Sequence, residues 1–144
     1  MSRFINPITL LALFGCMMFM YPHGVLADVS VAISPNGSTI NATAGSTGTV
    51  GFGATVSGAP SVGQECTLSG PTYSWSGGDS NSSLSSAGSG ATITFCYQDA
   101  GDYTISVGCS ASYSATSQDG KTNCGGPWSG SGSATVTIHV TCPG

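Results

Sequence analysis

The sequence predicts an all-β fold, a two-sheet antiparallel sandwich, in the part of the chain that follows residue 27. Apolar residues alternate with Ser, Thr or Gly over several short runs, which is typical of half-buried strands, and no run has the 3.6-residue period of a helix. Connections rich in Gly, Pro, Ser and Asn separate these runs. Six or seven such strands can bury their apolar faces when two sheets pack together.

The first 27 residues have the pattern of a secretory signal peptide. Arg3 precedes an apolar run from Ile8 to Tyr21, and Val25-Leu26-Ala27 predicts cleavage after Ala27. We therefore expect a secreted, cell-surface or periplasmic protein with no membrane insertion after cleavage. Two alternatives stay open: an uncleaved single-pass anchor, and a lipoprotein signal that leaves Cys16 as the lipidated N-terminus.

The remaining chain, residues 28–144, has the length of one domain and almost no positive charge. Its single basic residue is Lys121, whereas the acidic residues are Asp28, Glu65, Asp79, Asp99, Asp102 and Asp119. Nucleic acids and anionic membrane surfaces require clustered Lys and Arg, so both classes of partner are excluded. Ser, Thr, Gly and Asn supply the polar surface instead.

Three strands are predicted in the first half of the domain, at residues 29–34, 50–56 and 72–76. Gly51 and Gly53 occupy outward positions of the second strand, where they weaken it. Tyr73 and Trp75 point to one side of the third strand, and Trp75 is the predicted large anchor of the core.

Three further strands are predicted at residues 91–95, 103–109 and 134–140. A low-complexity connection, residues 79–90, precedes them and is expected to be a mobile loop with at most a short edge strand around Leu84. A second long loop, residues 115–131, is predicted between the last two strands.

The strand spacing, the absence of helical patterns and the Trp on the third strand favour a sandwich of immunoglobulin type. The corner before the fifth predicted strand agrees with this fold. Gly101 permits a sharp turn, and Tyr103 can bury its ring while its hydroxyl bonds back to the crossing chain. We expect Tyr103 to stabilise the fold rather than to take part in a reaction.

Two motifs carry a resemblance to a known family. An aromatic, a short spacer, Gly, any residue, Tyr and alternating apolar residues occur at Tyr97, Gly101, Tyr103, Ile105 and Val107. An aromatic strand before a Gly-Asp turn occurs at residues 73–80, with Ser and Gly where the family has an acidic residue and an aromatic. The chain resembles PKD (polycystic-kidney-disease-type) domains and their immunoglobulin-like bacterial relatives. The resemblance implies a non-catalytic spacer or an interaction module for proteins or carbohydrates.

The cysteines that remain after signal cleavage are Cys66, Cys96, Cys109, Cys124 and Cys142. In an exported protein they predict disulfides, with one thiol unpaired or available between chains, and their spacing does not suit a zinc or redox site. An immunoglobulin-type sandwich brings the connection after its second strand beside the last hairpin loop, so Cys66 is expected to pair with Cys124 or Cys109. The second expected bridge is Cys96–Cys142, although strand alternation points these two side chains to opposite faces.

We predict no catalytic residue, no cofactor and no metal site. His139 is the only imidazole after residue 27, and it lies on the outward face of its strand. Asp99 and Asp102 could form part of a calcium site, but acids at a corner more often serve as turn and capping residues.

Trp128 and Tyr113 are the aromatic candidates for a binding surface. The favoured function is a secreted, non-catalytic PKD-like module for extracellular protein interaction, adhesion or structural spacing. The alternatives are a carbohydrate-binding module that stacks a sugar on Trp128, and a small secreted hydrolase that uses His139 or the acidic residues. The expected partner is an extracellular protein or polysaccharide.

Overall fold

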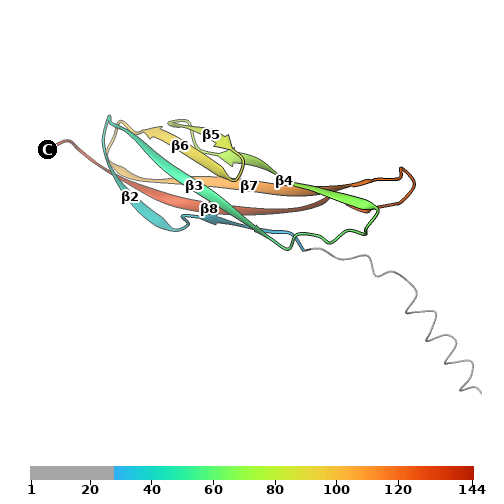
Figure 1. The fold of residues 1–144 in the computed structure, drawn as a ribbon. Coiled ribbons are helices and arrows are strands. Elements are labelled where there is room, and N and C mark those ends of the chain that lie inside the picture. Colours follow the sequence, from blue (N-terminus) through green and yellow to red (C-terminus); the bar gives the residue numbers. More distant parts are fainter. Residues whose placement is uncertain (1–27) are drawn as a thin grey trace, which may run out of the picture.

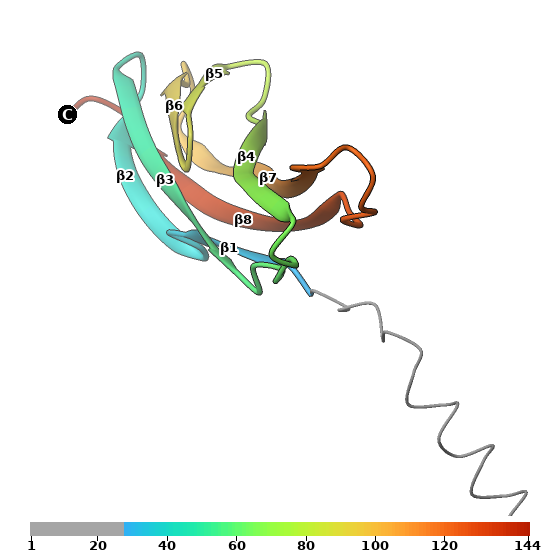
Figure 2. The same ribbon diagram turned by 45° about the vertical axis from the view of Figure 1, so that its right-hand side comes forward.

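Eight strands form two four-stranded sheets that face each other (Figures 1 and 2). The computed structural model describes residues 28–144, so the predicted signal peptide and the alternatives at Cys16 lie outside the described residues. Within residues 28–144, no helix is long and apolar enough to cross a membrane. The strands are β1 (Ser30–Ser34), β2 (Ser38–Thr43), β3 (Thr47–Ser57), β4 (Cys66–Gly77), β5 (Ser82–Ala87), β6 (Gly90–Cys96), β7 (Gly101–Ser117) and β8 (Trp128–Thr141).

The strand order is that of an immunoglobulin fold. One sheet has the order β1-β3-β6-β5, which corresponds to strands A, B, E and D of that fold, and β4, β7 and β8 correspond to C, F and G. β2 continues the first strand after Pro35 on the other sheet, where it pairs parallel with β8. The predicted all-β immunoglobulin-like sandwich is confirmed, with one parallel pair where only antiparallel pairs were expected.

Two edge strands have a weak signal in the sequence. β2 lies where no strand was predicted, because only Ile40 and Ala42 of its residues are apolar. β5 is the short edge strand allowed around Leu84; it pairs with β6 from Ser82 to Ala87, in the middle of the expected mobile loop. Both strands are held by backbone hydrogen bonds to a neighbouring strand. The amino-acid composition of a segment gives little indication of such pairing, so these strands are difficult to predict from the sequence.

β4, β7 and β8 are longer than predicted and extend beyond the facing sheet. β7 and β8 pair from Gly101–Val140 to Tyr113–Trp128, so the expected loop at residues 115–131 shortens to 118–127. A bulge between Ser69 and Thr72 lets β4 follow β7 to Ser117. In Figures 1 and 2 this extension and its orange-red loop form one end of the domain, and the C-terminus lies at the other.

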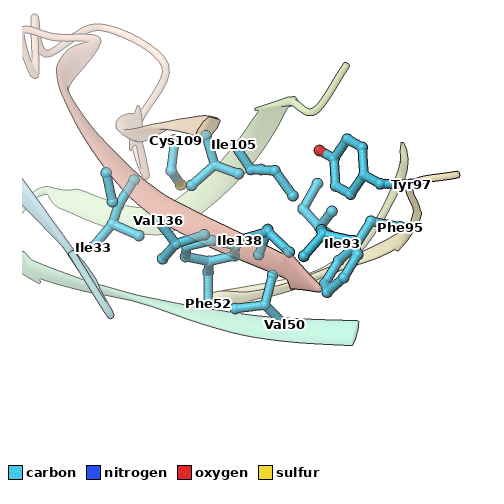
Figure 3. Close-up of a cluster of buried hydrophobic side chains, with 13 residues drawn as sticks. Ile33, Val50, Phe52, Ile93, Phe95, Tyr97, Ile105, Cys109, Val136 and Ile138 are labelled. Carbon is cyan, nitrogen blue, oxygen red and sulfur yellow. The ribbon is translucent and has the colours of Figure 1, made fainter. Parts of the chain in front are cut away.

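The core fills the space between the two sheets (Figure 3). Its largest fully buried side chains are Tyr97, Phe95, Ile93, Ile105, Ile138 and Val136. Trp75, the predicted anchor, is only half-buried and packs at the margin of this core, where its Nε1 donates to the carbonyl of Gly88 at 3.0 Å. Phe95 of the facing sheet and Tyr97, which directly follows β6, fill the centre instead, and this corrects the expected role of Trp75.

Candidate functional site

A disulfide joins the start of β4 to the β7–β8 loop at one end of the sandwich. Cys66 and Cys124 are separated by 58 residues, and their Cα atoms lie 5.8 Å apart. This bond confirms one of the two expected partners of Cys66, whereas Cys109 is a buried free thiol in β7. The start of β4 and the β7–β8 loop are therefore tied together, and in Figure 1 the green start of β4 lies beside the orange-red loop.

Asp119 organises the β7–β8 loop through four hydrogen bonds. Its Oδ1 accepts from Ser117 Oγ at 2.6 Å and from the backbone N–H groups of Lys121 and Thr122 at 2.8 and 2.9 Å. Its Oδ2 accepts from Thr122 Oγ1 at 2.9 Å. These bonds, led by the one from Ser117, hold the pKa of the carboxyl well below its ordinary value. The loop thus has a defined shape and leaves the side chain of Lys121 exposed.

The two aromatic candidates for binding pack into this end of the domain. Trp128 is half-buried at the first position of β8, and its indole covers the backbone of Gly125 and Gly126, where a Cβ on Gly126 would lie 2.7 Å from the ring. Tyr113 pairs with Trp128 across the hairpin and is 8% exposed. Tyr113 therefore belongs to the packing of this end, which corrects the expectation that it lies on a binding surface.

Cys96 and Cys142 are free thiols, so the expected Cys96–Cys142 bridge is wrong. The two residues flank the β2–β3 turn at the end of the domain opposite the disulfide. Gly45 N donates to the carbonyl of Tyr97 and Ala44 N donates to that of Thr141, both at 2.8 Å. The β2–β3 turn therefore bonds to the residue after Cys96 and to the residue before Cys142.

The predicted corner is held by two stacked tyrosines. Gly101 has a φ of 155°, which residues with a Cβ rarely adopt, and Tyr103 donates its hydroxyl to the carbonyl of Asp99 at 3.0 Å. The ring of Tyr103 stacks on that of Tyr97 with centroids 4.0 Å apart. The hydroxyl of Tyr97 in turn donates to Oδ2 of Asp79 at 2.6 Å. The sequence placed Asp79 in a Gly-Gly-Asp turn but did not predict this contact. This cluster joins the two sheets.

His139 and Asp102 form a pair on the outward face of the β2-β8-β7-β4 sheet. Their Nδ1 and Oδ1 atoms are 2.5 Å apart, and the side chains are 50% and 66% exposed. A hydrolase triad also requires a nucleophile, but no hydroxyl of residues 28–144 bonds the imidazole. Asp102 pairs with His139, so it does not join Asp99 in the calcium site considered from the sequence. Within residues 28–144, no three His, Cys, Asp or Glu side chains come together to hold a metal ion.

Comparisons with known proteins give distant structural likenesses. No protein-family model and no curated protein matches the chain. Titin domain M7 is similar at 14% identity, covering 78% of this chain and 94% of that chain with a TM-score of 0.41. A chain of the complex between titin M10 and obscurin-like 1 Ig is similar at 12% identity, covering 81% and 99% with a TM-score of 0.40. A nucleoside hydrolase-related hypothetical protein from Saccharophagus degradans is similar at 17% identity, covering 78% and 25% with a TM-score of 0.36.

Proposed function

We propose that the protein is a non-catalytic extracellular module that recognises a protein partner through the end closed by Cys66–Cys124. The observation that carries this proposal is the disulfide that ties the start of β4, where the β3–β4 connection ends, to the β7–β8 loop. In immunoglobulin variable domains, the corresponding loops are two of the recognition loops. Disulfides persist in oxidising compartments outside the cytosol, which agrees with the predicted signal peptide, and the resemblance to PKD domains implies the same class of role.

The organisation of the loop supports recognition by a preformed surface. The disulfide and the hydrogen bonds to Asp119 restrain the loop before any partner binds, so less conformational entropy is lost on association. Lys121, the one basic residue of residues 28–144, stands on this loop with its neighbour Asn123, and both are exposed. Glu65 and Asp119 are also exposed at this end, so a partner with an uncharged polar contact surface suits it better than an acidic one.

Affinity capture from the host's secretome or cell envelope tests the proposal, with quantitative mass spectrometry of the retained proteins. The test bait carries Lys121→Ala and Asn123→Ala, which remove exposed side chains and leave the bonds to Asp119 in place; Asn123→Ala also removes the bond that Gly125 N donates to Asn123 Oδ1 at 3.0 Å. A matched control carries Ser46→Ala and Gln98→Ala at the opposite end. The wild type and the control should retain a common partner, and the loop variant should retain about tenfold less. Equal retention by all three baits would refute recognition by the loop.

A further inference from the structure

A shallow hollow lies on the outward face of the β1-β3-β6-β5 sheet. Its volume is about 330 Å³, and Gly51, Gly90, Thr92, Ser85 and Ala87 are among its lining residues. Gly51 pairs with Thr92 across β3 and β6, and Thr92 pairs with Ser85 across β6 and β5. Because two of the lining positions are glycines, much of the floor is bare peptide backbone. This glycine hollow lies on a sheet face, away from the disulfide-tied loops.

No structural requirement explains glycine at position 51. Its φ is not positive, and a Cβ built there would meet no atom within 4 Å. Gly48, on the same strand, differs because a Cβ there would lie 2.5 Å from the ring of Phe95. Glycine inside a strand weakens it, and it often marks a place where a ligand approaches the backbone closely. The open space above Gly51 coincides with the hollow.

The chemistry of this face suits an uncharged ligand that carries hydroxyl groups. β1, β3, β5 and β6 contain no charged residue. Thr92 and Ser85 are exposed at the rim of the hollow. Within residues 28–144, the hydroxyl groups of these two residues take part in no hydrogen bond. Each hydroxyl can both donate and accept. Anionic ligands would find no cation here, and no exposed aromatic or long aliphatic side chain is available to hold an apolar ring.

We propose that the glycine hollow is a binding site for a neutral saccharide. One pyranose ring lies flat over the backbone at Gly51 and Gly90, and its hydroxyl groups exchange hydrogen bonds with Thr92 and Ser85. The site is separate from the loop end in both location and ligand, so it adds a second activity to the proposed protein recognition.

Chemical-shift mapping of the ¹⁵N-labelled protein tests this site with three probes: cellohexaose, chitohexaose and mannohexaose. At least one of them should shift the amides of Gly51, Gly90 and Thr92. Gly51→Val puts a Cβ where no atom lies within 4 Å, occupies part of the hollow and places a good strand former in β3, so we expect the variant to fold. Its Kd for the bound saccharide should rise at least about tenfold. Thr55→Val, on the same face of the same strand but outside the hollow, should bind as the wild type does.

Three results would overturn the assignment. The first is no amide shift at the hollow with any of the saccharides at about 10 mM, a concentration that reveals millimolar binding. The second is unchanged saccharide binding by Gly51→Val. The third is a shift caused by N-acetyltryptophanamide but by no saccharide, which would make the hollow a socket for an aromatic side chain of a protein. The Lys121→Ala/Asn123→Ala variant should bind the saccharide normally, so failure here is distinguishable from failure of the proposed protein recognition.

Discussion

Replacing Tyr97 by Phe tests how the end of the sandwich opposite the disulfide is held together. Tyr97 is 2% exposed, and its hydroxyl donates to a carboxylate oxygen of Asp79 at 2.6 Å. Tyr103, stacked on the same ring, donates to the neutral carbonyl of Asp99 at 3.0 Å. Tyr97→Phe and Tyr103→Phe therefore remove the same group from neighbouring rings but break bonds to acceptors of different charge.

The magnitude follows from the two acceptors. A hydrogen bond to a charged group contributes about 1.5–3 kcal/mol to the free energy of unfolding, and one between neutral groups about 0.5–1.5 kcal/mol. Asp79 keeps the bond from Asn81 N at 2.9 Å and remains accessible to water, so water replaces part of what Tyr97→Phe removes. We expect a loss of about 1.5 kcal/mol for Tyr97→Phe and about 0.5–1 kcal/mol for Tyr103→Phe. The Tm of Tyr97→Phe should fall by about 6 °C.

The two variants should also differ in their pH dependence. Burial by itself would raise the pKa of the Asp79 carboxyl, but hydrogen bonds from Tyr97, Asn81 and Ser82 outweigh it and lower this pKa below the ordinary value of 3.8. A carboxyl whose folded-state pKa is lowered stabilises the protein above its unfolded-state pKa, and this contribution is lost as the pH falls through the folded-state pKa. The penalty of Tyr97→Phe should therefore shrink in acid, and that of Tyr103→Phe should not change.

Urea unfolding of the wild type and both variants, at neutral pH and in acid, measures these differences. Unchanged m values are needed for the comparison, because they show that the unfolded states expose similar surface. A penalty for Tyr97→Phe below about 0.3 kcal/mol at neutral pH would refute the assigned strength of the bond. An equal penalty in acid and at neutral pH would refute the role of the charged Asp79.

Three further predictions concern the disulfide, the free thiols and the glycines of β3. The double variant Cys66→Ser/Cys124→Ser removes the disulfide, which closes a loop of 58 residues and so reduces the conformational entropy of the unfolded chain. The free energy of unfolding measured in urea should fall by about 4 kcal/mol. A loss below about 1 kcal/mol would contradict this entropic origin of the stabilisation. Iodoacetamide should label Cys142 first and Cys109 last in the native protein, because Cys142 is exposed whereas burial hides the Cys109 thiol and raises its pKa. Mass spectrometry measures the order of labelling, and equal labelling of the thiols in guanidinium is the control. Early labelling of Cys109 would contradict its burial in the core. Gly48→Ala should destabilise the protein by about 1–3 kcal/mol, because its Cβ would lie 2.5 Å from the ring of Phe95. The Cβ of Gly51→Ala meets no atom within 4 Å, so this variant should be more stable than the wild type by about 0.5 kcal/mol. Similar Tm shifts for the two variants would show that the space around each glycine does not decide whether the substitution stabilises or destabilises the protein.

Alternation along the chain was sufficient to predict the strands that contribute to the core. β3, β6 and the central part of β7 and β8 place apolar residues on one face, and the sequence shows this period directly. β2, β5 and the extensions of β7 and β8 are rich in Ser, Thr and Gly and depend on backbone pairing with neighbouring strands. Such strands have a weak signature in composition, because their stability comes from the neighbour.

The candidate sites divide along the same line. Spacing and fold class limited the partners of Cys66 to two, and the crossing of the β7–β8 loop over the start of β4 selected Cys124. The local sequence did not predict how exposed Tyr113 and Trp75 are. Segments from elsewhere in the chain bury Tyr113 and leave Trp75 at the margin of the core. The glycine hollow is likewise a product of three strands that meet in register.

The sequence by itself therefore determined the all-β class, the immunoglobulin-like order of the core strands and the near absence of positive charge after residue 27. These properties depend on short-range periodicity and on composition, both of which can be read along the chain. The tertiary structure alone decided which loops are tied together, which aromatics are buried and where the backbone is left bare. Those properties depend on contacts between segments far apart in the sequence, and the three-dimensional packing of the two sheets determines them.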